Sequence, residues 1–299
     1  MQRKWRIWKP FLRRYLQRKA AAYDLCVTVV PENYAADLEG LYDFSCTEYV
    51  RQVIDVSGGW QGTRSAFSKT KRQITNRFEE KFGLEYRIST DINEFKLFYH
   101  KMFVPHIKKR FKDLSNIESY AEMMHFFIKG QLLLITRDSE IIAAALFLVE
   151  DDTLVFRRTG VINGDESLIK GGAQLALYYF QIQYAIDQNL KYVDTMLSSA
   201  FMNDGVYKNK REWGASVLED ESAENRIYFS NAKPSPKISQ FFENNPLIID
   251  SAGGLKGVVG VSDSAEMTSD SIERLIGKYR IKGVASFSLI TPTEVIEHQ

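Results

Sequence analysis

Residues 132–197 constrain the fold of this chain more than any other segment. Three apolar runs follow one another here with only short polar turns between them: residues 132–136, 141–149 and 153–161. Turns of this length join antiparallel neighbours, so the runs predict a three-stranded meander. A long apolar helix is expected over residues 169–189, and a strand over residues 191–197 then returns beside the meander.

Further elements are predicted on both sides of this segment. Upstream we expect strands at residues 23–30, 48–56 and 84–89. Helices are expected at residues 68–82, ending at Gly83, from Asp91 onward with a kink at Pro105, and at residues 117–128. Downstream we expect helices at residues 238–242 and 271–279 and strands at residues 255–261 and 284–290. The order predicts an α+β (mixed α/β) fold with a central mixed sheet, helices on both faces and a small C-terminal βαβ-like extension.

The composition is that of a soluble globular protein of 299 residues, with 44% hydrophobic and 26% charged residues. Cys26 and Cys46 are too few for a disulfide framework and have no zinc-site spacing, so we expect a reducing cytoplasmic location and no metal. The longest apolar run falls far short of the roughly 20 residues that span a bilayer. The four histidines form no ligand or nucleophile motif, so each is expected at the surface or satisfied in the core: His100, His106, His125 and His298.

The N-terminal leader differs chemically from the rest of the chain. Residues 1–22 hold eight Lys or Arg and no acid, and aromatic residues recur among them at helical spacing. Such a helix could bind any of three partners: an anionic membrane surface through residues 1–19, an RNA backbone, or the protein's own core.

The whole chain is predicted to have four consecutive segments. They are the leader (1–22), N-terminal strands and a partial subdomain (23–67), a core (68–233) and a C-terminal extension (234–299).

The sequence offers two candidate anion sites, one within the third strand of the meander and one after it. Lys170, Gly171, Gly172 and Ala173 lie at the start of the long helix, where unobstructed backbone N–H groups and the helix dipole favour a phosphate. Close packing is the alternative reason for the two glycines. The adjacent pair Arg157 and Arg158 lies within the strand; because side chains alternate, one of them is expected to face the groove and meet an anion or a cross-strand partner.

Three short motifs stand in an order that resembles the GNAT acyltransferase superfamily, and more narrowly its Fem-like branch. They are "SKTKRQI" at residues 68–74, "YVD" at 192–194 and "KREWG" at 210–214. The resemblance covers roughly residues 48–230. It implies a GNAT-like core and an N-acyltransferase that moves an acyl group to an amine of a cell-envelope or polysaccharide precursor.

The resemblance leaves the donor open. Acyl-coenzyme A users of the superfamily commonly have Arg or Gln where this chain has Leu168, although Gly171-Gly172-Ala173 keeps the rest of their turn. Acyl-CoA is the favoured co-substrate because the full N-terminal half and the helical arm of the tRNA-dependent Fem enzymes have no counterpart here. Aminoacyl-tRNA remains an alternative donor, and a non-catalytic module that binds a membrane surface is the non-enzymatic alternative.

The resemblance also suggests catalytic residues. Lys210 stands where this branch places a lysine in its catalytic groove, so it is expected to stabilise the oxyanion of the tetrahedral intermediate. Asp194, at the mouth between strands that splay apart, would orient the amine or accept its proton, and Asp204 is a second candidate carboxylate. Trp213 is expected to anchor the core behind the lysine.

Overall fold

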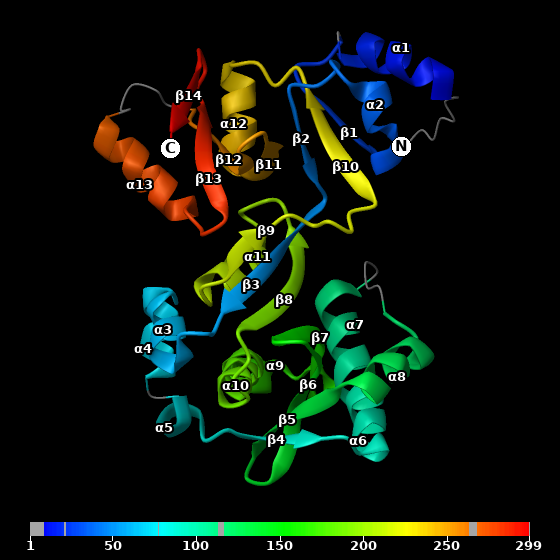
Figure 1. Ribbon diagram of the computed structural model, residues 1–299, viewed down its shortest axis with the longest axis vertical. Coiled ribbons are helices and arrows are strands. Elements are labelled where there is room, and N and C mark those ends of the chain that lie inside the picture. Colours follow the sequence, from blue (N-terminus) through cyan, green and yellow to red (C-terminus); the bar gives the residue numbers. More distant parts are fainter. Residues whose placement is uncertain (1–8, 21, 77, 113–116, 263–267, 299) are drawn as a thin grey trace. The chain divides into compact units, whose positions relative to one another are not determined.

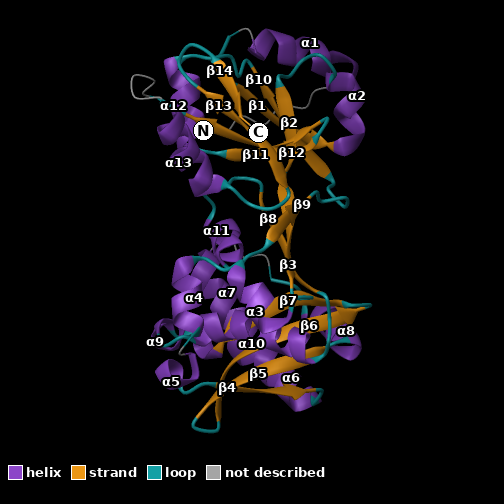
Figure 2. Ribbon diagram, turned by 60° about the vertical axis from the view of Figure 1, so that its left-hand side comes forward, coloured by secondary structure: helices purple, strands orange, loops and turns teal. Residues whose placement is uncertain are grey.

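The computed structural model describes residues 9–20, 22–76, 78–112, 117–262 and 268–298. They form two compact units (Figure 1, Figure 2). Unit 2 consists of residues 53–196 and 211–215, and unit 1 of the other described residues. The chain passes from one unit to the other within β3 (Tyr49–Asp55), β8 (Tyr192–Ser199) and α11 (Gly205–Glu212), and a fourth time between Ala215 and Ser216. The units therefore differ from the four consecutive segments predicted.

The largest sheet has seven strands in the order β4, β5, β6, β7, β8, β3, β9. Its other members are β4 (Glu85–Ser89), β5 (Gln131–Arg137), β6 (Glu140–Glu150), β7 (Thr153–Val161) and β9 (Ser216–Leu218). The pairs β4–β5, β5–β6 and β6–β7 are antiparallel, and β7 pairs with β8 in parallel. The predicted meander and the mixed sheet are confirmed.

Two layers of helices pack on this sheet within unit 2. Leu133 and Ile135 of β5 belong to one core cluster together with α10 (Ala173–Asp187). Their neighbours Leu132 and Leu134 belong to another, with α6 (Ile92–Leu97), the π-helix η2 (Phe98–Phe103) and α8 (Tyr120–Lys129). Because side chains alternate across a strand, a fully apolar run buries both of its faces. The predicted helices on both faces are confirmed (Figure 1).

Several predicted helices are divided in the structure. The helix expected at 68–82 forms α4 (Lys69–Thr75) and α5 (Phe78–Phe82), with the Ser68 hydroxyl accepting from Lys71 N as the N-cap of α4. The helix expected from residue 169 forms α9 (Glu166–Lys170) and α10, because Gly171 ends the first and Gly172 has φ 97°. A third helix, α3 (Gly59–Ser65), was not predicted.

The helical segment after Asp91 is continuous around Pro105. Asp91 caps α6 as predicted, and Pro105 is the second residue of α7 (Val104–Phe111), which follows η2 directly. The irregularity is instead the π-helical turn η2 that precedes it. Ser119 and Glu122 then form a capping box at the start of α8.

Unit 1 contains two further sheets, of order β1–β10–β2 and β11–β12–β13–β14. Their strands are β1 (Cys26–Pro31), β2 (Phe44–Thr47), β10 (Asn225–Ser230), β11 (Leu247–Ser251), β12 (Gly254–Gly260), β13 (Val284–Ile290) and β14 (Val295–His298). β12 and β13 are parallel and are joined through α13 (Ser269–Tyr279), so the predicted βαβ-like extension is confirmed. α12 (Pro236–Asn244) precedes them.

Two short helices accompany the first sheet of unit 1. They are α1 (Lys9–Ala20) and α2 (Ala35–Leu38). Arg13 Nη1 of α1 donates to Glu39 O at 3.0 Å, and the Asn231 side-chain amide donates to Ala20 O. Through these bonds α1 is attached to unit 1. Within the ranges that the structure describes, no helix is both long and apolar enough to cross a bilayer.

Candidate active site

The parallel pairing of β7 and β8 ends early. It comprises Thr153–Tyr192, Leu154–Val193 and Val155–Asp194, although β7 continues to residue 161 and β8 to residue 199. Beyond Val155 and Asp194, the two described strands no longer pair with each other. The predicted parallel strands that separate at one end are therefore confirmed, and Asp194 is the last residue of β8 that pairs with β7.

The backbone of β8 changes direction locally at this point. Met196 has φ 65°, a conformation that non-glycine residues adopt infrequently. Asp194 Oδ1 accepts a hydrogen bond from Met196 N at 2.8 Å, which is the Asx-turn arrangement that stabilises such a backbone. The Asp194 side chain is buried, with 4% of its residue surface exposed. A buried carboxylate thus lies where the paired strands end.

A bulge in β7 faces the same region. In the β6–β7 ladder, Leu146 pairs with Arg158 and Phe147 with Phe156, so Arg157 is the extra residue. Such a bulge re-aims side chains and interrupts strict alternation. As a result both Arg157 and Arg158 line one cavity, together with Met196 of β8. The prediction that only one arginine faces the groove was wrong because it assumed an unbroken strand.

This cavity, with a volume of about 350 Å³, has arginines on one wall and α8 on the other. The Arg157 guanidinium lies 4.2 Å from the centroid of the Phe126 ring, and its buried Nε has no hydrogen-bond partner among the described residues. Arg158 forms an ion pair with Glu118, and burial lowers the pKa of its guanidinium. The cavity therefore combines two arginines and the carboxylates of Glu118 and Glu122 with apolar Met123 and Met196.

Lys210 and Asp204, the other predicted catalytic residues, belong to unit 1. Lys210 lies on α11 with only 3% of its surface exposed, and its Nζ donates to Leu197 O at 2.8 Å. Asp204 precedes the same helix, and its Oδ1 accepts from Val206 N at 2.8 Å and Tyr207 N at 2.9 Å. Asp204 is therefore the N-cap of α11, a structural role that the sequence prediction missed.

The glycine turn before α10 uses its own amides. Gly171 N donates to Ser167 O at 2.8 Å and Gly172 N to Ile169 O at 3.1 Å. A Cβ at Gly172 would lie 2.6 Å from the Phe82 ring. The expectation that these two amides face a bound anion is wrong, and close packing explains the glycines. Ala173 is buried, and the Lys170 side chain is 82% exposed, with Glu166 at 4.0 Å.

Lys71 is a buried cation for which no role was predicted from the sequence. Burial lowers the pKa of its ammonium group, while Glu212, at 3.6 Å from Nζ, partly offsets this. The Nζ also lies 5.0 Å from the centroid of the Trp213 ring. Lys71 belongs to the "SKTKRQI" motif, and Glu212 and Trp213 belong to "KREWG". The two motifs thus meet inside unit 2, which their separation in the sequence did not reveal.

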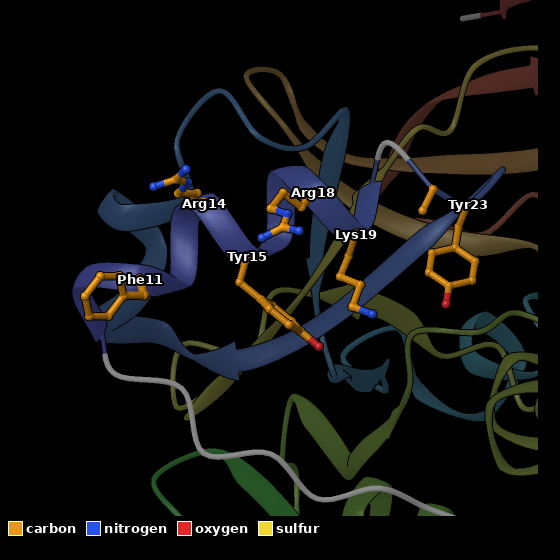
Figure 3. Close-up of a pocket in the computed structure, with 7 residues that line it drawn as sticks. Phe11, Arg14, Tyr15, Arg18, Lys19 and Tyr23 are labelled. Atoms are coloured by element: carbon orange, nitrogen blue, oxygen red, sulfur yellow. The ribbon is translucent and has the colours of Figure 1, made fainter.

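A cationic surface on unit 1 involves the described part of the leader. Figure 3 shows Phe11, Arg14, Tyr15, Arg18 and Lys19 along α1, with Tyr23 beyond its end. Phe11 is 64% and Tyr23 59% exposed. Residues 1–8, which carry the rest of the predicted basic leader, lie outside the described residues. Exposed aromatic and basic side chains therefore share one surface, which we call the α1 surface.

The fold resembles several solved structures at low sequence identity. FemX aligns with a TM-score of 0.49 and 12% identity over 68% of this chain and 66% of that chain, so this chain spans about two thirds of FemX. L-PGS from Bacillus licheniformis gives 0.43 and 13% over 74% and 72%. A GCN5-related N-acetyltransferase from Sphaerobacter thermophilus gives 0.38 and 11% over 69% and 58%. No protein-family model and no curated protein matches the chain.

These similarities concern the fold alone. The order strand, helices, antiparallel meander, helix and parallel strand in unit 2 is the GNAT-like order that the motifs implied. Unit 2 is a mixed α+β fold with helices on both faces of its sheet.

Proposed function

We propose that the chain is an N-acyltransferase that transfers an acyl group from acyl-CoA to an amine of a cell-envelope or polysaccharide precursor. The observation that carries the proposal is the end of β7–β8 pairing at Val155 and Asp194, beside a cavity that two arginines border. Backbone groups on the facing edges of separated strands are available to a ligand. A thioester placed there would meet β7 N–H donors in place of a strand.

The reaction needs a base, hydrogen-bond donors that stabilise the oxyanion, and a leaving group. The amine nitrogen attacks the thioester carbonyl carbon, and the oxygen takes negative charge that backbone N–H groups of β7 stabilise. Asp194 accepts the proton that the amine loses. The C–S bond then breaks, and the sulfur takes the proton that Asp194 accepted and leaves as a thiol, which restores the carboxylate. One amide and one free thiol form for each thioester consumed.

Thiol release tests this proposal. Purified protein would be incubated with a panel of acyl-CoA species and amines, and free thiol would be measured for wild type and for Asp194→Asn. Asparagine keeps the oxygen that accepts from Met196 N, so the fold should persist while the base is lost. We expect thiol release to fall at least about 10²-fold. Equal release by both proteins would contradict the role of Asp194.

The same assay distinguishes acyl-CoA from aminoacyl-tRNA as the acyl donor. Aminoacyl-tRNA presents an ester instead of a thioester and needs no change in the acceptor chemistry. Replacing acyl-CoA by charged tRNA and following deacylation would identify it as the donor if only that arm turns over. Inactivity in both arms, with a folded protein, would favour a non-catalytic module.

We also propose that the α1 surface holds the protein against an anionic membrane from the cytoplasmic side, close to an envelope precursor. The supporting observation is that exposed Phe11 and Tyr23 flank Arg14, Arg18 and Lys19 (Figure 3). Apolar insertion and about 1 kcal/mol per basic residue near an anionic surface together favour such an attachment.

Vesicle sedimentation tests this attachment. The triple variant Arg14→Gln, Arg18→Gln, Lys19→Gln should bind phosphatidylglycerol-containing vesicles at least about tenfold more weakly. A control of equal charge change is Lys96→Gln, Lys101→Gln, Lys129→Gln, which alters exposed lysines of unit 2. If both triple variants lose binding equally, net charge explains it and the α1 surface has no specific part.

A further inference from the structure

A second cavity of unit 2 shares no lining residue with the one beside Met196. Its volume is about 350 Å³, and α7, the 3-10 turn η4 (Ile162–Gly164), α9 and the first turn of α10 border it. This volume lies within the range of small-molecule sites. The acyl-transfer chemistry proposed above uses none of its residues.

One wall of this cavity consists of nitrogen-bearing side chains from a single helix face. His106, Lys109 and Arg110 of α7 all line the cavity. Residues separated by three and four positions lie on the same side of a helix, so their side chains converge. The face therefore combines an imidazole with two cations.

His106 is buried without satisfying its polar atoms. Only 4% of its surface is exposed, and neither ring nitrogen has a hydrogen-bond partner among the described residues. Burial, and secondly the charge of Arg110, lower the pKa of the imidazole, so the ring is neutral at pH 7. A buried polar group without a partner is costly, and a ligand that pairs with it removes that cost. The prediction that His106 lies at the surface or is satisfied in the core is therefore wrong, because the ring is buried and neither nitrogen is hydrogen-bonded to a described residue.

The wall opposite α7, which includes Gly164, lies very close to that helix. Gly164 has φ 56°, and a Cβ there would lie 3.1 Å from His106 Cα and 3.0 Å from Lys109 Cδ. Lys109 Nζ is 3.4 Å from Gly164 O. Gln174, in the first turn of α10, adds a side-chain amide to the lining, and that turn contains no acidic residue. A side chain at this position would be strained by the positive φ and would crowd α7.

The charges of the lining favour an anion with more than one negative charge. Lys109 and Arg110 are cationic, whereas the acidic lining residue Glu166 has a side chain that is 83% exposed and interacts weakly with Lys170. Exposure screens the Glu166 charge more strongly than it would screen a buried one. A dianionic phosphate matches two cations better than a monocarboxylate does, and its oxygens suit an imidazole N–H and an amide.

We propose that the cavity between α7 and the start of α10 binds the phosphoryl group of a small molecule. His106 and Gln174 contribute hydrogen bonds, and Lys109 and Arg110 contribute charge. The site is separate from the acyl-transfer proposal, because phosphate binding can be measured without any acyl donor or acceptor.

Histidine NMR provides the test. The full-length protein, labelled at its histidine rings, would be titrated with inorganic phosphate and, separately, with glycerol 3-phosphate at constant ionic strength; glycerol is the uncharged control. The His106 signal is assigned by its loss in His106→Gln. We expect a saturable shift of that signal with both phosphates and none with glycerol. Tighter binding of glycerol 3-phosphate indicates a phosphomonoester, and equal binding indicates inorganic phosphate; both support the site.

A pair of adjacent lysines makes the test specific. Lys109→Gln should weaken phosphate binding about tenfold, whereas Lys108→Gln, an exposed neighbour outside the cavity, should change it less than twofold. The proposal is overturned if phosphate at tens of millimolar leaves the His106 signal unmoved. It is also overturned if both lysine variants weaken binding equally, because the effect would then be that of net charge.

Discussion

The ring of Trp213 lies nearly parallel to that of Tyr178, with centroids 5.7 Å apart and 6° between the planes. Phe67 packs edge-on against the same indole at 5.1 Å, and Trp213 is only 1% exposed. The tryptophan of the "KREWG" motif is therefore a core residue of unit 2, as expected from the sequence.

Truncating this ring should destabilise the protein. Trp213→Ala removes a buried indole and leaves a cavity, so we expect a loss of about 3–5 kcal/mol in the free energy of unfolding by urea denaturation. Trp213→Phe keeps part of the stack with Tyr178 and should lose clearly less. A Trp213→Ala protein of wild-type stability would show that the indole does not anchor the core.

Asp204 separates a structural from a catalytic role. Asp204→Ala removes the cap of α11 and should cost about 0.5–2 kcal/mol of stability, whereas Asp204→Asn keeps an accepting oxygen and should cost little. Turnover per folded molecule should match wild type in the asparagine variant. If that variant is stable but turns over at least tenfold more slowly, the carboxylate takes part in catalysis and the capping account is incomplete.

Lys210→Met tests the role that the family resemblance gives to this lysine. The variant leaves Leu197 O without its donor, so we expect a stability loss of about 1.5–3 kcal/mol, the range for hydrogen bonds to charged groups. If Lys210 also stabilises the oxyanion, turnover of the folded variant should fall about 10²-fold with little change in donor affinity. Lys208→Met, on the same helix, is the matched control. Full turnover in Lys210→Met would leave the lysine with a purely structural part.

Cys46 should make stability fall at alkaline pH. Burial, and secondly the charge of Asp250, raise the pKa of its thiol from 9.0 to about 12, while Arg226 offsets this in part. Between these values the unfolded thiol loses its proton and the folded one keeps it, so rising pH favours unfolding. Wild type should lose about 1.4 kcal/mol more than Cys46→Ala between pH 8 and pH 10 in urea unfolding. Parallel pH profiles of the two proteins would contradict the raised pKa.

The sequence predicted those parts of the fold that local patterns determine. Continuous apolar runs with polar turns identified β5, β6 and β7, and capping residues such as Asp91 marked helix starts. The β1–β10–β2 sheet was not predicted because its central strand comes far later in the chain than its neighbours: Cys46 pairs across from Ile227. Partners at that separation leave no local periodicity.

The candidate site was predicted only in part for similar reasons. The family resemblance implied the position of Asp194 and the separation of its strand from β7, but the bulge that brings Arg157 and Arg158 together depends on a register shift against β6. The capping role of Asp204 and the engaged amides of Gly171 depend on backbone geometry that residue types alone do not specify. The unsatisfied state of His106 depends on which neighbours bury it.

The central claim, that a thioester binds where β7 and β8 stop pairing, is tested most directly at Met196. Its side chain lines the cavity two residues after Asp194, whereas buried Met202 lies in unit 1. In protein labelled at methionine methyl groups, with the Met196 signal assigned through Met196→Leu, acyl-CoA should shift that signal saturably and leave the Met202 signal in place. An unmoved Met196 signal at saturating acyl-CoA, or shifts confined to Met202, would contradict the claim.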